Sequence, residues 1–247
     1  MLNENLTVEL KIDKGCVLIA EAGHHFCTTD ITTAKAMLIY HHYQKVRNEY
    51  STNFHLFATA SFSLSAEICQ EDLKFEKIVV YFNSLGEWGD SIKDEQSKDL
   101  LLARLMEVQY DISHVVFKFP YKIASSRSSY TPPNIDVAHK FVFAYLDKFA
   151  NFLEFKEYIS DVKIMSLKLL NTFYHTQKCV SYTPLQIAWA AMHLSCLKDC
   201  IEIEENKCWQ KELFACIPDT KIFHKVVNDM SLITEVATRE CNHNEAF

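Results

Sequence analysis

Glycine and proline are scarce in this chain, and their scarcity limits the folds that the chain can adopt. Only 4 glycines and 5 prolines occur among 247 residues, whereas average usage is about 7% glycine and 5% proline. A β-sandwich or β-barrel needs many tight turns, which these two residues form most readily. Hydrophobic residues make up 49% of the chain, enough for a substantial core. The composition therefore predicts a folded and mostly helical protein.

Charge and cysteine content limit the cellular compartment and the classes of partner that we expect for this chain. The net charge is −7, whereas proteins that bind nucleic acid generally are basic, so no nucleic-acid partner is expected. Nine cysteines, an odd number in a chain of this length, argue against a disulfide framework. The sequence opens without a signal-peptide pattern, and no apolar window is long enough to span a bilayer. We therefore expect an intracellular, reducing compartment and no membrane partner.

Two segments interrupt the helical pattern and mark the domain organisation. Residues 83–99 hold two of the four glycines and several charges, and residues 124–134 combine serines with two prolines. Because the second segment lies near the middle of the chain, we place the domain linker there. Residues 54–66 and 187–197 are almost free of charge. Helices that are apolar on all faces must be surrounded by other helices, so each half is predicted to contain one buried central helix.

The two halves resemble each other when the chain is shifted by 130 positions. This shift places Ala58 and Ala60 on Ala188 and Ala190, and it also aligns the preceding helical segments without a gap. Small residues on a central helix let its neighbours approach closely. The pattern predicts an all-α tandem of two domains, with a period too long for a solenoid.

No catalytic motif is recognisable in the sequence, and the candidate metal ligands are unconvincing. Walker, GxGxxG, GxSxG, HExxH and paired CxxC motifs do not occur. Two groups of histidine and cysteine have ligand chemistry, but buried cysteine and ordinary histidine explain both more simply. These groups are His193, Cys196, Cys200 and Cys208, and His24, His25, Cys27, His41 and His42. We therefore predict no metal, no cofactor and no catalytic residue, and a function that depends on a helical surface.

Several segments are similar to the cyclin family, and most closely to its cyclin Q branch. Residues 19–23 and 31–43 resemble the entry and first helix of the first cyclin box, and residues 56–65 resemble its buried third helix. Residues 119–122 resemble the motif that closes this box, and residues 169–194 the core of the second box. Trp209 and Gln210 resemble the approach to the last helix.

The resemblance implies a tandem pair of five-helix cyclin boxes. On this basis the first box is expected at residues 15–123 and the second at 135–240. An N-terminal extension (1–14), the linker (124–134) and a C-terminal tail (241–247) complete the chain.

Cyclins are regulatory subunits, so the resemblance implies that this chain binds and activates a cyclin-dependent protein kinase and is not itself an enzyme. The implied partner is cyclin-dependent kinase ten or a close relative, in serine/threonine phosphorylation that controls transcription or the cell cycle, in the nucleus, the cytoplasm or both. Family alignment places the kinase-facing surface on one set of residues: Tyr40, Tyr43, Glu67, Ile68, Cys69, Gln70, Leu101 and Arg104.

One position departs from the family pattern and puts standard kinase binding in doubt. Most cyclins carry a lysine just after the buried third helix, where this chain has Glu67. In the family that lysine pairs with a glutamate of the fifth helix, and two alignments place either Leu101 or Arg104 at the glutamate position. If Arg104 is the counterpart, the pair is reversed in sign but retained. Otherwise Glu67 is a solvated residue at a helix end.

Three alternative functions remain open. A diverged cyclin could bind a partner without activating a kinase, which the reversal at Glu67 favours. A transcription adaptor of the same fold would bind DNA and polymerase, which the net charge of −7 disfavours. A metal-bound helical enzyme would need an inward-facing set of ligands.

Overall fold

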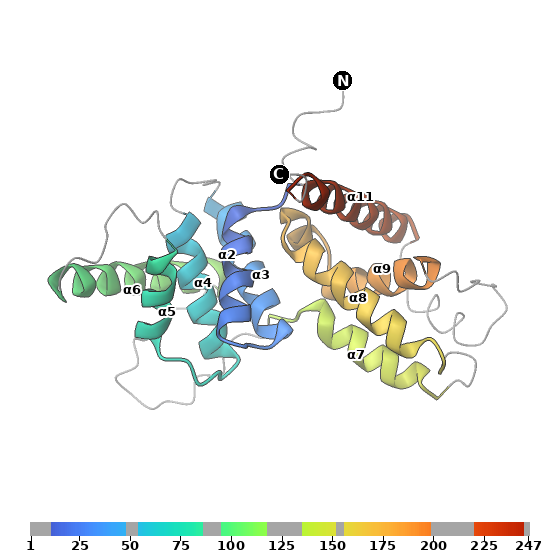
Figure 1. Cartoon of the computed structure of the whole chain (residues 1–247), viewed down its shortest axis with the longest axis horizontal. Coiled ribbons are helices and arrows are strands. Elements are labelled where there is room, and N and C mark those ends of the chain that lie inside the picture. Colours follow the sequence, from blue (N-terminus) through green and yellow to red (C-terminus); the bar gives the residue numbers. More distant parts are fainter. Residues whose placement is uncertain are drawn as a thin grey trace, which may run out of the picture. The chain divides into compact units, whose positions relative to one another are not determined.

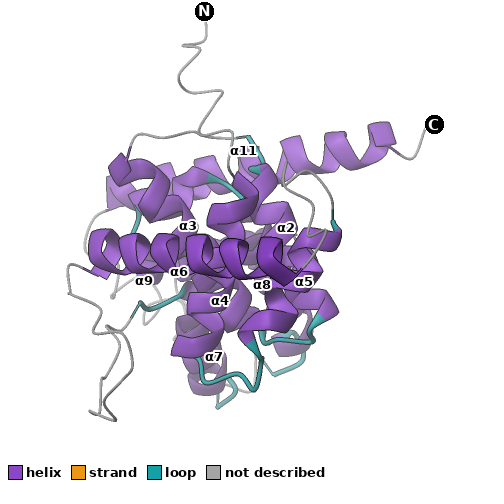
Figure 2. Ribbon diagram, turned by 90° about the vertical axis from the view of Figure 1, so that its left-hand side faces the viewer, coloured by secondary structure: helices purple, strands orange, loops and turns teal. Residues whose placement is uncertain are grey.

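The computed structural model describes residues 11–47, 54–85, 95–117, 135–151, 156–198 and 220–244. All regular secondary structure in these residues is helical, which confirms the all-α prediction (Figures 1 and 2). The chain divides into two compact units. The N-terminal unit is Asp13–Ile135, and the C-terminal unit contains the described residues from Asp136 onward. The predicted linker at 124–134 and the motif at 119–122 lie outside the described residues.

The N-terminal unit is built around one buried helix. Its helices are α2 (Lys14–His25), α3 (Asp30–Arg47), α4 (Phe54–Ile68), α5 (Phe75–Ser84) and α6 (Glu95–Phe117). Helix α4 packs against the other four (Figure 1), and every residue from His55 to Ala66 is buried. The prediction of a buried helix enclosed by others is therefore confirmed for this segment, because a helix apolar on all faces leaves water only by such enclosure.

The C-terminal unit has a central helix of the same kind. Its elements are α7 (Ala138–Phe149), α8 (Ile159–Tyr174), the short 3₁₀ helix η1 (Gln177–Ser181), α9 (Pro184–Lys198) and α11 (Thr220–Asn244). Helix α9 packs against α7, α8 and α11. It begins at Pro184 after a reciprocal cap, in which Gln186 N donates to Thr183 Oγ1 (3.3 Å) and Thr183 N to Gln186 Oε1 (2.9 Å). Helix α11 continues to Asn244, four residues past the expected end of the second box at 240.

The two central helices correspond in position and in one buried polar contact. Helices α4 and α9 each have 15 residues, and the shift of 130 carries Phe54 to Pro184 and Ile68 to Lys198. Ser65 Oγ donates to Thr32 O on α3 (2.7 Å), and its counterpart Ser195 lies 2.9 Å from Ser166 Oγ on α8. Each central helix is thus tied to the helix before it by a buried serine. The correspondence is consistent with an internal duplication, and the assignment as cyclin boxes stays a prediction.

Buried tyrosines hold the start of the first helix in each unit. Tyr40 Oη of α3 donates to Asp13 Oδ1 (2.9 Å), the residue that caps α2 through Gly15 N (2.8 Å). In the C-terminal unit, Tyr174 Oη of α8 accepts from Ala138 N, the first residue of α7 (2.9 Å). Such contacts satisfy backbone N–H groups that have no partner inside the helix, so each tyrosine stabilises a helix end.

Alkaline pH is expected to destabilise the protein through Tyr40. Burial, followed by the charge of Asp13, raises the pKa of the Tyr40 phenol above its ordinary value of 10.0. Above that pH the unfolded chain loses this proton and the folded chain keeps it. Stability is therefore full below pH 10 and falls as pH rises above it, by up to about 1.4 kcal/mol per pH unit for one such group.

Urea unfolding of Tyr40→Phe between pH 8 and 11 measures how much Tyr40 contributes to the loss of stability at alkaline pH. The variant loses one hydrogen bond at every pH, but its stability should fall less steeply above pH 10 than that of the wild type. Tyr158→Phe removes an exposed hydroxyl and is the matched control. If the stability of Tyr40→Phe falls above pH 10 as steeply as that of the wild type, Tyr40 is not the source of the pH dependence.

Candidate partner-binding site

The end of helix α4 makes a sharp, fully hydrogen-bonded turn. Gln70 adopts a left-handed backbone conformation (φ 59°). Its N–H donates to Glu67 O (3.1 Å), and Glu71 N donates to Ala66 O (2.9 Å). These two bonds form a Schellman motif, a common helix end in which glycine usually occupies the left-handed position. The turn redirects the chain away from α4 and toward α5.

The segment after this turn is held by the start of helix α3. Glu71 Oε1 accepts a hydrogen bond from Thr32 Oγ1 (2.6 Å) and one from Thr29 N (3.4 Å). Thr29 also caps α3 through its own hydroxyl, which accepts from Thr32 N (3.2 Å). A carboxylate at a helix N-terminus is stabilised by the unpaired N–H groups and the helix dipole. The connection from α4 to α5 is therefore fixed in place on the rest of the unit.

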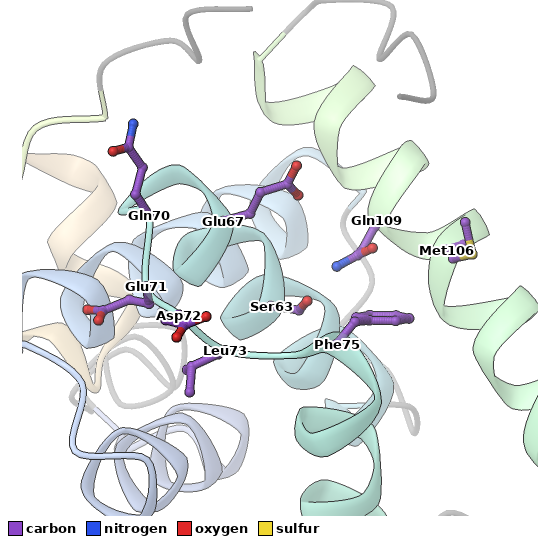
Figure 3. Close-up of a pocket in the computed structure, with 9 residues that line it drawn as sticks. All are labelled: Ser63, Glu67, Gln70, Glu71, Asp72, Leu73, Phe75, Met106 and Gln109. Atoms are coloured by element: carbon purple, nitrogen blue, oxygen red, sulfur yellow. The ribbon is translucent and has the colours of Figure 1, made fainter. Parts of the chain in front are cut away.

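A pocket of about 550 Å³ lies between this turn and helix α6. Its lining residues come from α4, from the connection after it, from the first residue of α5 and from α6 (Figure 3). They are Ser63, Glu67, Gln70, Glu71, Asp72, Leu73, Phe75, Met106 and Gln109. Its volume is within the range of about 300–1,000 Å³ typical of ligand pockets.

The lining of the pocket combines carboxylates, uncharged polar groups and apolar surface. Ser63 is only 7% exposed, and within the described residues neither its hydroxyl nor the Gln109 amide has a hydrogen-bond partner. Met106 is 52% exposed, a high value for a side chain of this type. A surface that leaves a methionine side chain in water is suited to a partner that covers it.

Four of the eight residues implied by the resemblance lie together at this turn. Glu67 and Gln70 line the pocket, and Ile68 and Cys69 are half-buried in the same turn. Arg104 is exposed on α6, whereas Leu101 is 8% exposed and packs in the core. Only Arg104 can therefore present its side chain to Glu67 or to a partner. The Glu67–Arg104 ion pair stays a prediction.

Two further candidates, Tyr40 and Tyr43, are core residues. Tyr40 is 0% exposed and Tyr43 is 5% exposed, because both side chains turn inward from α3. Neither can contact a partner in this conformation. The kinase-facing surface implied by the resemblance thus narrows to the α4 turn and the exposed side of α6.

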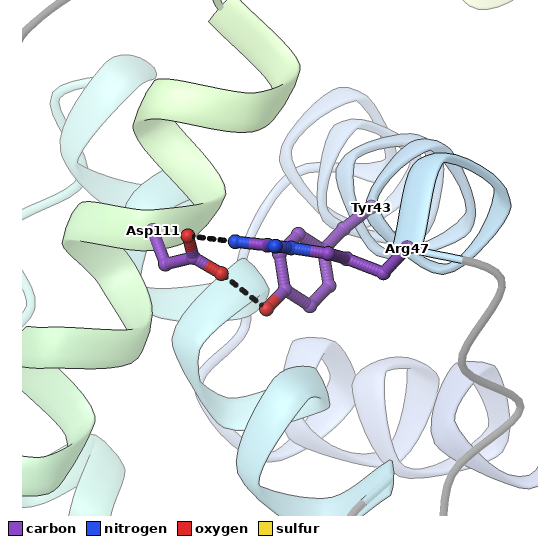
Figure 4. Close-up of polar contacts among 3 residues, drawn as sticks. All are labelled: Tyr43, Arg47 and Asp111. Atoms are coloured by element: carbon purple, nitrogen blue, oxygen red, sulfur yellow. Dashed lines mark hydrogen bonds and ion pairs between the residues drawn. The ribbon is translucent and has the colours of Figure 1, made fainter.

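Tyr43 instead belongs to a polar clamp between helices α3 and α6 (Figure 4). Its hydroxyl donates to Asp111 Oδ2 (2.6 Å), and Arg47 forms an ion pair with the other carboxylate oxygen. Burial, followed by the contact with Asp111, raises the pKa of the Tyr43 phenol. In the C-terminal unit Asp229 of α11 is held similarly, by the hydroxyl of Tyr182 and by Lys178 Nζ at 3.9 Å.

Asp111→Ala is expected to lower the free energy of unfolding by about 1 kcal/mol, mainly through the Tyr43 hydrogen bond. Arg47→Ala should cost less, because the Arg47–Asp111 pair is substantially exposed and such pairs contribute little. Urea denaturation is measured for Asp111→Ala, for Arg47→Ala and for the double variant Tyr43→Phe/Asp111→Ala. Together these variants give the contributions of the Tyr43 hydrogen bond and of the Arg47–Asp111 ion pair to stability. If Arg47→Ala costs as much as Asp111→Ala, the ion pair and not the hydrogen bond holds the clamp.

The candidate metal ligands do not assemble in the part of the chain that the structure describes. No group of three or more His, Cys, Asp or Glu residues there is arranged to hold a metal ion. Cys200 and Cys208 lie outside the described residues. His193 and Cys196 are on α9, and burial, with nearby His224, lowers the pKa of His193.

The second group, around His24, is also dispersed. His25 stacks on Tyr81 with the ring centroids 4.1 Å apart, and His41 Nε2 lies 3.1 Å from Cys16 Sγ in the core. Each of these two histidines is therefore occupied by a different structural contact.

None of the described helices has the length and apolarity needed to cross a membrane.

Sequence reasoning missed seven of the nine pocket residues: Ser63, Glu71, Asp72, Leu73, Phe75, Met106 and Gln109. Met106 and Tyr110 are large apolar residues four positions apart on α6, a spacing that equally fits a core face, and their exposure is evident only from the structure. Ser63 gave no signal in the sequence, because it lies among the uniformly buried residues of α4.

Comparison with known proteins adds no family assignment: no family model matches the chain, and no curated protein matches it. The likeness to cyclins therefore depends on the sequence motifs alone, and the all-helical, two-unit architecture is compatible with it.

Proposed function

We propose that this chain is a cyclin-like regulatory subunit that binds and activates a cyclin-dependent protein kinase. The observation that carries the proposal is the pocket at the end of α4 against α6, because the sequence resemblance independently implies kinase contact at Glu67–Gln70 and on the α6 segment. The cyclin Q-like motifs make cyclin-dependent kinase ten, or a close relative, the kinase to test first.

The proposed mechanism is selection of the active kinase conformation. Kinase activity requires the glutamate of the kinase αC helix to pair with the lysine of strand β3. A protein that binds the αC-in state more tightly than the αC-out state shifts the population toward activity. The Schellman turn and the Glu71–Thr32 bond keep the α4 end rigid. Little ordering entropy is then lost on binding, which favours affinity.

Reversal of the charge at Glu67 tests the proposed surface. The chain is co-expressed with cyclin-dependent kinase ten, purified as a complex, and assayed for phosphorylation of a serine/threonine substrate against kinase alone. Glu67→Lys should weaken binding and activation at least about tenfold, because it places a cation where the partner meets a carboxylate. Glu21→Lys makes the same change at an exposed position on α2 and is the matched control.

The outcomes separate the alternatives. A kinase that binds and gains activity, with loss in Glu67→Lys alone, supports the proposal. A kinase that binds without gaining activity supports the diverged scaffold, which the glutamate at position 67 favours. Failure to bind cyclin-dependent kinase ten and its relatives overturns the proposed function.

A further inference from the structure

Two helix ends in the N-terminal unit place a residue with a side chain in a backbone conformation that favours glycine. Cys27 follows the end of α2 with φ 53°, and Gln70 follows the end of α4 with φ 59°. Thr28 N donates to Gly23 O (3.0 Å), so α2 ends in a Schellman motif as α4 does. In the left-handed region the Cβ atom crowds a carbonyl oxygen, so glycine is the residue that fits both positions without strain.

The side chain of Cys27 contacts its own helix end. Its thiol donates to His24 O (3.7 Å), the same oxygen that accepts from Cys27 N (3.2 Å). A thiol is a weak donor, but this contact ties the side chain to the last turn of α2. The presence of cysteine at position 27 therefore has an explanation within the fold.

The side chain of Gln70 makes no such contact. It is exposed at the border of the pocket, and its amide forms no hydrogen bond with any residue that the structure describes. Figure 3 shows it extending outward from the turn. Backbone bonds and the contact of Glu71 with Thr32 hold this turn, so glycine at position 70 would suit it better. No contact within the described residues accounts for a glutamine here.

We propose that Gln70 is a specificity-determining contact, whose side-chain amide forms hydrogen bonds with main-chain groups of the partner kinase. Strained backbone positions are concentrated at binding sites and switch regions. A glutamine amide has one C=O acceptor and N–H donors, as a peptide group has, so it can bond a donor and an acceptor of one exposed backbone segment. A cationic group would be bound more strongly by glutamate than by this neutral amide. The inference rests on the proposed function in taking the partner to be a kinase.

Gln70→Gly separates the effect on the fold from the effect on binding. The variant removes the left-handed strain, so its equilibrium constant for unfolding in urea should fall several-fold. It also removes the amide, so its affinity for immobilised cyclin-dependent kinase ten, measured by biolayer interferometry, should fall about tenfold. A residue with only a structural role would not combine a more stable fold with weaker binding.

Three further variants identify the chemistry of the contact. Gln70→Met keeps the length of the side chain but removes its hydrogen-bonding groups, so it should weaken binding about as much as Gln70→Gly. Gln70→Glu tests for a cation on the partner, and tighter binding by this variant would overturn the main-chain contact. Cys27→Gly is the matched control, because it relieves the same strain at a residue that does not line the pocket. It should stabilise the unit and leave the affinity unchanged.

The outcomes distinguish this inference from the proposed function. If the kinase binds the wild type and Gln70→Gly equally tightly, the contact at Gln70 fails and the proposed function stands. An equal loss of affinity in Cys27→Gly would also overturn the contact, because the loss would then follow from the helix ends in general. If no cyclin-dependent kinase binds the wild type, the proposed function fails and the contact fails with it.

Discussion

Phe62→Ala is expected to lower the free energy of unfolding of the N-terminal unit by about 4 kcal/mol, the largest effect predicted for this chain. Phe62 lies at the centre of α4 with 0% exposure. Its ring lies 6.0 Å from that of Phe26 and 5.9 Å from that of Phe82, so it joins α4 to the end of α2 and to α5. Truncation removes the buried ring and leaves a cavity that these rigid helices cannot close.

Urea denaturation followed by circular dichroism measures this loss. Phe54→Ala is the matched control, because Phe54 is the first residue of the same helix and is only half-buried. Its truncation should cost less than half as much. Equal losses in the two variants would show that α4 is not the enclosed centre of the unit.

Gly15→Ala should destabilise the same unit by about 2 kcal/mol, although alanine is the better helix former. A Cβ atom at Gly15 would lie 2.3 Å from Tyr40 Oη and 2.4 Å from Tyr40 Cζ. The Tyr40 ring cannot withdraw, because it is fully buried and its hydroxyl is bonded to Asp13. The added methyl therefore displaces either α2 or α3.

Gly23→Ala provides the comparison within the same helix. Its Cβ would lie 2.3 Å from Thr33 Oγ1 and 3.1 Å from Thr33 Cγ2, so this substitution displaces a small, part-buried side chain instead of a fully buried ring. Because both substitutions gain the same helix propensity, the difference between their unfolding midpoints in urea compares the clash with Tyr40 with the clash with Thr33. A Gly15→Ala variant as stable as the wild type would contradict the close approach of α2 and α3 at Tyr40.

Much of the secondary structure followed from local sequence, because helix formation and burial leave local signals. The uncharged segments at 54–66 and 187–197 predicted two buried helices, and both are present. Thr29 and Thr183 directly precede helices, and each caps the helix that follows it through its hydroxyl. Apolar composition and capping act over one or two turns, so they can be read without knowledge of the fold.

The interior positions of individual aromatic residues could not be predicted in this way. Tyr40 and Tyr43 have hydroxyls that suit either a surface or a core, and their burial depends on acceptors far along the chain. Tyr43 reaches Asp111 across 68 positions, and Tyr40 reaches Asp13 across 27. A buried phenol is tolerated only where such an acceptor is present. That condition is set by helix packing and leaves no local trace.

The sequence by itself determined that this protein is helical and that each half is organised around one small-residue, uncharged helix, because scarce turn residues and uniform apolarity act locally. Only the tertiary structure decided which residues of those helices line a pocket and which fill the core. Ser63 and Phe62 are neighbours on α4, but one lines a pocket and the other fills the core. The difference arises because α2, α3, α5 and α6 together enclose α4, whereas the pocket lies beside the end of α4, where the chain turns at Gln70.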